Sequence, residues 1–156
     1  SWLDISKVKK SVKTIKWPGR LEKIKNKNIY YDVAHNVEGI SAMIKTISNS
    51  HADKKVVGLF SLKSEKNIKP ICNVIKNNFE IIILCHDKSS YLTRTKVLEK
   101  ILNENSIKCF SVSSVKKGVE ALEKYNDDYV KIIFGSHYIA EEVYNATGKH
   151  FDTTNN

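Results

Sequence analysis

The alternation of two kinds of apolar segment constrains the fold of this chain more than any other feature. Short, nearly continuous apolar runs are typical of strands buried on both faces, and segments with apolar residues three and four positions apart are typical of helices. Their alternation predicts an α/β fold, a three-layer, Rossmann-like, mostly parallel sheet covered by helices. The predicted strands cover 21–25, 29–33, 55–62, 80–85, 108–112 and 129–134, and the predicted helices cover 37–48, 65–77, 93–103, 115–125 and 137–147.

The first two predicted strands differ from the others because only a short turn candidate at 26–28 separates them. An antiparallel β-hairpin is therefore expected at the start of the domain. Before it, Pro18 and Gly19 interrupt a lysine-rich amphipathic segment. We divide the chain into a leader or linker helix at 1–16, one domain at 17–150 and a tail at 151–156, with Gly148 ending the last helix.

The charge of the chain favours an anionic partner. Lys and Arg number 26 against 17 Asp and Glu, which gives a formal net charge of +9. A nucleotide, a polyanionic substrate or an acidic neighbouring domain would suit this charge, and so would a merely solvated, lysine-rich surface. The charges are spread over many segments without a basic helix or a patterned array of aromatic residues. Nucleic acid is therefore not expected as a partner.

The cysteines and the hydropathy pattern point to a reducing, cytoplasmic location. Cys72, Cys85 and Cys109 show no Cys-x-x-Cys spacing, and two of them fall in predicted strands, where a reduced cysteine acts as a small apolar residue. Their use as reduced thiols suits the cytoplasm. No apolar run approaches the length of a membrane span, so no membrane partner is expected.

Polar residues follow the second predicted strand directly, in the run Asp32-Val33-Ala34-His35-Asn36. Ligands of open α/β sheets bind outside the carboxyl ends of strands, and the free amides of a helix N-terminus favour anions. Asp32 can therefore accept hydrogen bonds from a ribose, and His35 and Asn36 can face a ligand. The alternative is local: Asn36 caps the following helix, and Asp32 bonds within the turn.

A second polar strand end is the run Gly135-Ser136-His137-Tyr138, after the last predicted strand. Gly135 permits a close approach of the main chain, and Ser136 can bind a carboxylate or cap the last helix. The Gly-x-Ser-x-Gly elbow of serine hydrolases is missing, which disfavours that class. Dinucleotide fingerprints, phosphate-binding P-loops and zinc-ligand spacings are also missing from the sequence.

Three motifs in this order closely resemble a known family. Pro18-Gly19-Arg20, then Asp32 to Asn36, then Gly135 to Tyr138 resemble the C-terminal domain of folylpolyglutamate synthase/dihydrofolate synthase, in the Mur ligase superfamily. The family motif is Asp-Gly-Ala-His-Asn-Pro, so Val33 and Val37 depart from it. His137 stands where Leu is usual, and Leu62-Lys63-Ser64 keeps only the Lys of an Asp-Lys-Asp run.

The resemblance implies an ATP- and Mg²⁺-dependent ligase that adds L-glutamate to folate or dihydropteroate through an acyl phosphate. It implies an N-terminal P-loop ATPase domain in the same polypeptide, which would hold most Mg²⁺ ligands, and a monomeric enzyme. We therefore expect this chain to be part of a longer protein and inactive alone. A stand-alone binding module and the C-terminal domain of another Mur-type ligase are the alternatives.

The resemblance also assigns roles to single residues. Arg20 would contact the ATP phosphates, and Asp32 would bond the ribose or orient Arg20. His35 and Ser136 would be the catalytic residues and would position the incoming glutamate, with Asn36 supporting substrate binding. Lys63 is a further candidate contact for an anion, and no metal ligand is assigned to this chain. These roles require the polar strand ends near Asp32 and Ser136 to lie side by side.

Overall fold

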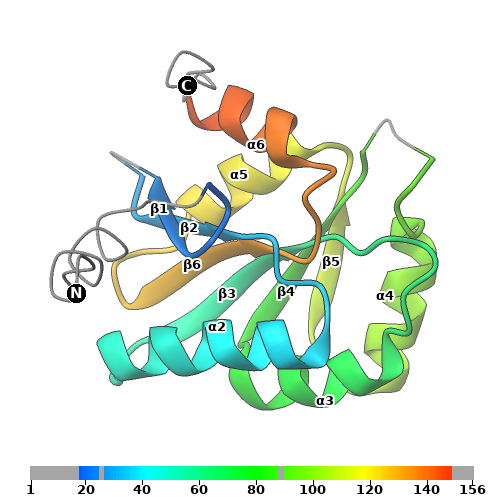
Figure 1. Cartoon of the computed structure of the whole chain (residues 1–156), viewed down its shortest axis with the longest axis horizontal. Coiled ribbons are helices and arrows are strands. Elements are labelled where there is room, and N and C mark those ends of the chain that lie inside the picture. The colour runs from blue at the N-terminus through cyan, green and yellow to red at the C-terminus, as the bar shows by residue number, and fades with distance from the viewer. Residues whose placement is uncertain (1–17, 25–26, 88–89, 149–156) are drawn as a thin grey trace, which may run out of the picture.

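The computed structural model describes residues 18–24, 27–87 and 90–148. The predicted leader helix at 1–16 and the tail at 151–156 lie outside these ranges. Strands and helices alternate after an initial hairpin, as the sequence predicts (Figure 1). The elements are β1 (Glu22–Ile24), β2 (Ile29–Asp32), α2 (Val37–Ser50), β3 (Lys55–Phe60), α3 (Lys69–Asn78), β4 (Ile81–Cys85), α4 (Thr95–Glu104), β5 (Cys109–Val112), α5 (Val115–Glu123), β6 (Tyr129–Phe134) and α6 (Ala140–Thr147).

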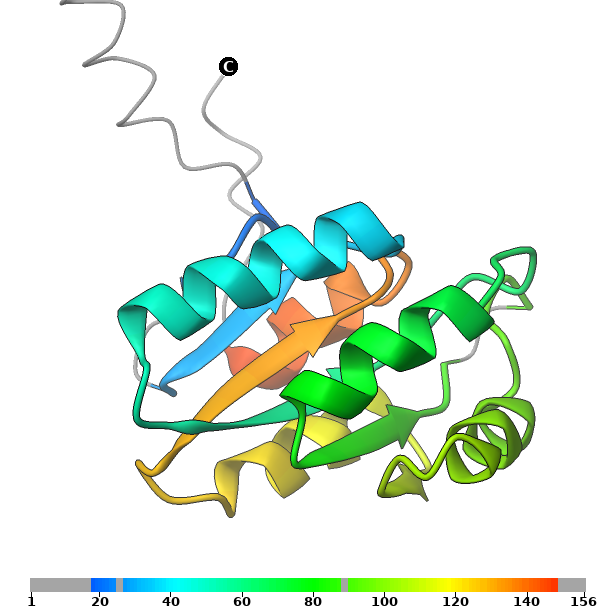
Figure 2. The same cartoon turned by 90° about the horizontal axis from the view of Figure 1, so that it is seen from below.

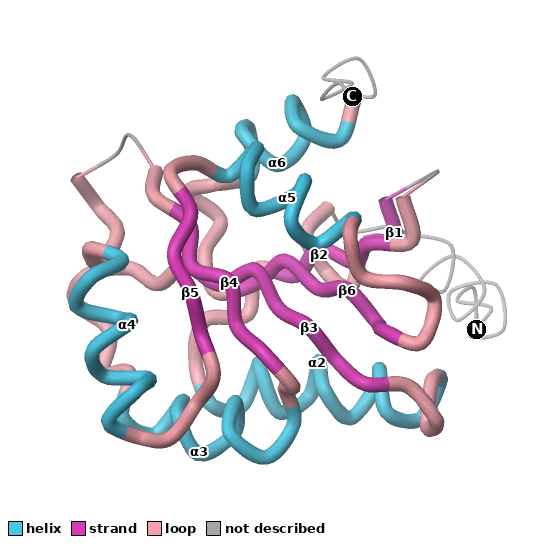
Figure 3. The backbone as a smooth tube through the Cα atoms, turned by 180° about the vertical axis from the view of Figure 1, so that it is seen from behind, coloured by secondary structure: helices cyan, strands magenta, loops and turns pink. Residues whose placement is uncertain are grey.

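Within the described residues, six strands form one sheet in the order β1-β2-β6-β3-β4-β5 (Figure 3). Only β1 is antiparallel to its neighbour, which confirms the predicted hairpin and the mostly parallel sheet. The last strand, β6, lies between β2 and β3 and pairs with both. Because these strands are parallel, their carboxyl ends meet at one rim of the sheet.

Helices cover both faces of the sheet, which confirms the three-layer architecture. Figures 1 and 2 show α2 and α3 together on one face, with α5 and α6 on the other. Two hydrophobic cores follow from this arrangement: one contains the buried residues of α2, α3 and α4, and the other contains those of α5 and α6. Successive strand residues point to opposite faces, so Val56 and Phe60 join the first core and Val57 and Leu59 join the second.

Several element ends differ from the sequence prediction. Helix α3 begins at Lys69 instead of residue 65, and Pro70 occupies its first turn, where a missing N–H costs nothing. Helix α6 begins at Ala140 instead of residue 137. Gly148 does end α6, with a left-handed φ of 70°, as expected. No helix among the described residues is long and apolar enough to cross a membrane.

Candidate functional site at the carboxyl rim of the sheet

The two polar strand ends lie side by side, as predicted. Asp32 at the end of β2 is the register partner of Phe134 at the end of β6, and Phe134 also pairs with Phe60 at the end of β3. We name the segments at this rim the arginine turn (19–21), the histidine loop (32–36), the lysine loop (61–66) and the serine loop (135–138). The chain leaves β6 toward one face and leaves β2 and β3 toward the other (Figure 1), which is how ligand crevices form in such sheets.

The arginine turn is strained, and hydrogen bonds to its main-chain groups hold it in place. Gly19 and Leu21 have φ values of 69° and 41°, and the positive value is costly for Leu21 because it carries a Cβ. The Val33 N–H donates to the Gly19 carbonyl at 2.8 Å, and the Leu21 N–H donates to Asp32 Oδ2 at 2.8 Å. Arg20 is exposed between these contacts. Strain maintained in this way is typical of functional sites.

Asp32 is the residue that joins the arginine turn to the histidine loop. Its side chain is only 6% exposed, and its Oδ1 accepts the Ala34 N–H at 2.7 Å while its Oδ2 accepts the Leu21 N–H. Both carboxylate oxygens are thus engaged by main-chain amides. This arrangement favours the orienting role for Asp32 over direct contact with a ribose, and it includes the local turn bond that the sequence left open.

His35 and Asn36, just before α2, differ in what their side chains bond. The His35 Nδ1 lies 3.0 Å from the Val33 carbonyl, so a proton on Nδ1 leaves Nε2 as an acceptor. The Asn36 Oδ1 accepts the Gly39 N–H at 2.9 Å, which makes Asn36 the N-cap of α2. The capping alternative for Asn36 is therefore confirmed, and His35, which is half-buried, is the better candidate for contact with a ligand.

The serine loop is anchored on both sides. Gly135 has a φ of 102°, and a Cβ built there would lie 2.0 Å from the Ser61 carbonyl oxygen. Ser136 is 3% exposed, and its Oγ accepts the Tyr138 N–H at 3.1 Å. The expectation that Ser136 could cap the last helix is wrong, because Ile139 is the N-cap of α6 and the serine hydroxyl closes a turn in the preceding loop.

The lysine loop adds charged side chains to the rim, and a pair of tyrosines lies near it. Lys63 Nζ lies 2.9 Å from Glu65 Oε2, and this hydrogen bond and the Glu65 charge raise the pKa of Lys63. The Glu65 carboxylate therefore offsets the charge that would attract an anion. Nearby, the exposed Tyr91 ring stacks on Tyr138 at 5.1 Å between centroids, which joins the loop after β4 to the serine loop.

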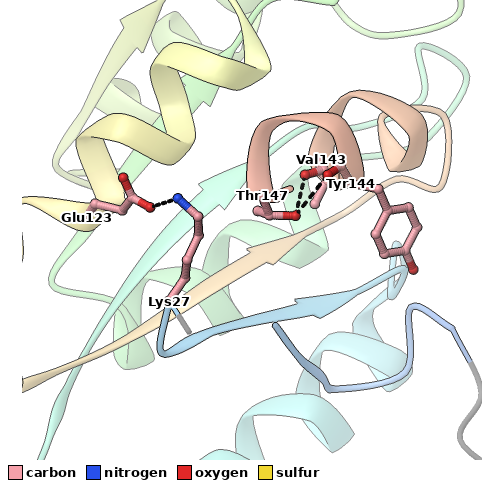
Figure 4. Close-up of polar contacts among 5 residues, drawn as sticks. All are labelled: Lys27, Glu123, Val143, Tyr144 and Thr147. Atoms are coloured by element: carbon pink, nitrogen blue, oxygen red, sulfur yellow. Dashed lines mark hydrogen bonds and ion pairs between the residues drawn. The ribbon is translucent and has the colours of Figure 1, made fainter. Parts of the chain in front are cut away.

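A groove of about 570 Å³ lies elsewhere, along α6, with Lys27 and Lys116 in its lining. Figure 4 shows Lys27 reaching Glu123 on α5, where the two form an ion pair. The Thr147 hydroxyl donates to the Val143 carbonyl at 2.7 Å within the helix. Lys27 thus ties the β1–β2 hairpin to α5, and Thr147 bonds within its own helix, so we place the candidate site at the rim. Among the described residues, no group of three or more His, Cys, Asp or Glu side chains is arranged to hold a metal ion.

The order of the rim segments along the chain matches one family. A family model described as "Mur ligase, glutamate ligase domain" matches residues 19–137, which include the arginine turn, the histidine loop and most of the serine loop. This chain belongs to the Mur ligase glutamate ligase domain family. The resemblance inferred from the three motifs is thereby confirmed, despite the departures at Val33 and Val37.

Relatives of this glutamate ligase domain are larger proteins. Dihydrofolate synthase/folylpolyglutamate synthase of Bacillus subtilis is 28% identical over 132 residues, which cover 81% of this chain and 30% of that protein. The protein of the same name from Mycobacterium tuberculosis is 27% identical over 88 residues, which cover 56% of this chain and 18% of that protein. The domain thus spans less than a third of the length of these relatives.

Solved structures also share the fold. Mycobacterium tuberculosis folylpolyglutamate synthase complexed with ADP matches with a TM-score of 0.83 and 20% identity, covering 96% of this chain and 36% of that one. E. coli FolC in complex with DHPP and ADP matches with a TM-score of 0.79 and 17% identity, with the same coverage. At these identities the matches establish the α/β fold of the glutamate ligase domain.

Sequence reasoning missed two features of the rim. It treated Leu21 as an ordinary strand residue, although Leu21 adopts a positive φ beside Arg20. It also gave Tyr31 no part beyond its place in the predicted strand 29–33, although the Tyr31 hydroxyl donates to the Ser136 carbonyl 105 residues away. The first has only the preceding Pro-Gly as a local signal, and the second has none because the contact depends on the strand order.

Proposed function

We propose that this chain is the glutamate- and nucleotide-contacting domain of an ATP-dependent ligase that adds L-glutamate to folate or dihydropteroate. The observation that carries the proposal is the convergence of the arginine turn, the histidine loop and the serine loop at one rim, through the pairing of β2 with β6. Family membership supports an amide ligase, and the names of the relatives support the folate substrate class.

In the proposed reaction the γ-phosphoryl group of ATP moves to the acceptor carboxylate, which is a poor electrophile before it is phosphorylated. The glutamate amine then forms the C–N bond and loses a proton, and the C–O bond to phosphate breaks. Negative charge accumulates on phosphate oxygens, so a cation near them lowers the barrier. Mg²⁺ would supply part of this charge when bound, with ligands from an N-terminal P-loop domain.

The residues of this chain have distinct parts in that scheme. Arg20 is exposed on a turn whose main chain is fixed by Asp32, so its guanidinium can reach the ATP phosphates without a rearrangement of the main chain. His35 Nε2 can accept a proton or a hydrogen bond from the glutamate amine while Nδ1 is held by the Val33 carbonyl. The Ser136 hydroxyl accepts from the Tyr138 amide and keeps its own proton to donate to a glutamate carboxylate.

The test is an assay of the complete protein that contains this chain, with ATP, glutamate and either folate or dihydropteroate. We expect ATP- and glutamate-dependent elongation, and no elongation by the 156-residue chain alone. Arg20→Ala should lower kcat by about a hundredfold with an unchanged melting temperature, the scale of losing one transition-state charge contact. Ser136→Ala should chiefly raise the KM for glutamate.

Two results would overturn the proposal. Turnover of a cell-wall precursor without any response to folates would favour another Mur-type ligase. If the single variants Arg20→Ala, His35→Ala and Ser136→Ala all showed unchanged kinetics, the rim would take no part in the reaction. Lys54→Ala, at an exposed lysine between α2 and β3, is the matched control for lost positive charge and should leave turnover unchanged.

A further inference from the structure

Two tyrosines lie beneath the rim, on the face covered by α5 and α6. Tyr31 on β2 is fully buried, and its hydroxyl donates to the Ser136 carbonyl at 3.1 Å. Burial, with a smaller contribution from the Asp32 charge, raises the pKa of Tyr31 well above its ordinary value. The hydroxyl therefore stays protonated at any working pH and remains a donor. This hydrogen bond holds the serine loop in a fixed position relative to β2.

The second tyrosine, Tyr144 on α6, is tied to the arginine turn. Its hydroxyl donates to Glu22 Oε2 at 2.7 Å, and the Gly19 N–H donates to the same oxygen at 3.0 Å. Figure 4 shows the Tyr144 ring projecting from α6. Glu22 lies directly opposite Tyr31 in the β1–β2 pair, so the two side chains share a face of the sheet.

The two tyrosine rings meet edge to face. Their centroids are 5.9 Å apart and their planes are at 89°, a favourable arrangement of aromatic quadrupoles. A continuous path of contacts thus runs from the Gly19 amide through Glu22, Tyr144 and Tyr31 to the Ser136 carbonyl. We call Glu22, Tyr144 and Tyr31 the tyrosine bridge.

We propose that the tyrosine bridge positions the arginine turn and the serine loop relative to each other, so that the phosphate contact and the glutamate contact are set together. This inference rests on the proposed function. The bridge residues act through the loops and are positioning residues, since they lie under the rim and not on it.

The need for such a bridge follows from the position of the two segments. The serine loop follows β6 in the middle of the sheet, whereas the arginine turn precedes β1, the outer strand beyond β2. The turn also contains the positive φ of Leu21, a conformation that persists only where surrounding contacts over-determine it. Asp32 supplies one such contact from the histidine loop, and Glu22 with Tyr144 supplies a second from the serine-loop side.

The experiment removes one hydroxyl at a time in the complete protein. Tyr31→Phe should raise the KM for glutamate about fivefold, and Tyr144→Phe should raise the KM for ATP about fivefold, the size of one hydrogen bond. Each variant should also raise the other KM, which a purely local contact would leave unchanged. Because the residues act as a unit, the double variant should lose less in kcat/KM than the product of the two single losses. Tyr30→Phe is the matched control, since the Tyr30 hydroxyl bonds His51 on the opposite side of β2 and should leave both KM values unchanged.

The outcomes separate this inference from the proposed function. A fall in melting temperature with both KM values unchanged, or strictly multiplicative losses in the double variant, would overturn the bridge while the ligase activity stands. If the wild-type protein has no glutamate ligase activity, amide NMR spectra of the 156-residue chain still test whether the bridge couples the two segments. Tyr144→Phe should then shift the amides of the serine loop, and shifts confined to the arginine turn would refute the coupling.

Discussion

At Gly135 the main chain passes so close to β3 that no side chain fits. An added Cβ would lie 2.0 Å from the Ser61 carbonyl oxygen, and the φ of 102° is costly for any other residue. Gly135→Ala should therefore lower the free energy of unfolding by at least about 2 kcal/mol. Gly148→Ala is the control, because Gly148 also has a positive φ but nothing lies within 4 Å of its Cβ position; its cost should be about 1 kcal/mol. Urea denaturation measures both, and equal costs would refute the clash.

Ser61 presents the opposite case, a side chain whose removal should not weaken the fold. Ser61 is 2% exposed, and its hydroxyl is the buried side-chain group of the described residues that has no hydrogen-bond partner. Ser61→Ala should leave the free energy of unfolding unchanged or raise it by up to about 1 kcal/mol, because a desolvated, unpaired hydroxyl is unfavourable. Ser114→Ala makes the same substitution at the N-cap of α5 and should cost about 1 kcal/mol. A loss at Ser61 as large as that at Ser114 would mean that the hydroxyl is satisfied in solution.

Among the elements, apolar periodicity predicted the central strands and the helices, because burial on both faces leaves little room for polar residues in β3, β4 and β6. The ends of helices were less predictable. The sequence predicted a last helix from His137, but the close approach of Gly135 to Ser61 and the hydrogen bond from Tyr31 to the Ser136 carbonyl hold the serine loop outside α6. Those contacts depend on the order of the strands in the sheet, which local sequence patterns do not predict.

The candidate site was predictable to the extent that local chemistry marks it. Asp32, His35 and Ser136 stand out as polar residues at strand ends, and the motif resemblance supplied their proximity and that of Arg20. The tyrosine bridge was not predictable, because Glu22 and Tyr144 are 122 residues apart and each looks ordinary in its own element. Side-chain contacts across the layers appear only once α6 is docked on the sheet.

Helix α5 approaches β3 unusually closely, and Gly118 makes this possible. A Cβ at Gly118 would lie 2.4 Å from Leu59 Cδ1, and Leu59 is fully buried and has little space in which to move. Gly118→Ala should lower the free energy of unfolding by about 1–3 kcal/mol through overpacking, although alanine is the better helix former by about 1 kcal/mol. Adding Leu59→Val should recover part of the loss. Thermal denaturation of the single and double variants tests this, and stabilisation by Gly118→Ala alone would contradict the close approach.

For the whole molecule, the strand order implies a gradient of stability across the sheet. Strands β6 and β3 are the two central strands and pair with each other, whereas β1 and β5 are the outer strands of the described sheet. Amide hydrogen exchange should therefore be slowest in β6 and β3, close to the global unfolding free energy, and faster in β1 and β5. The gradient runs across the candidate site, since the serine loop follows β6 while the arginine turn precedes β1.

This gradient makes the arginine turn the first part of the site to open. Tyr144→Phe should speed exchange in the arginine turn and β1 and leave β3 and β6 unchanged, because the hydrogen bond that it removes joins α6 to β1. Exchange monitored by NMR on the 156-residue chain can follow each strand separately. Protection of β1 equal to that of β6 in the wild-type chain would mean that the hairpin unfolds only with the core. The sheet alone would then hold Leu21 in its strained conformation, and the tyrosine bridge would not be needed to position the arginine turn.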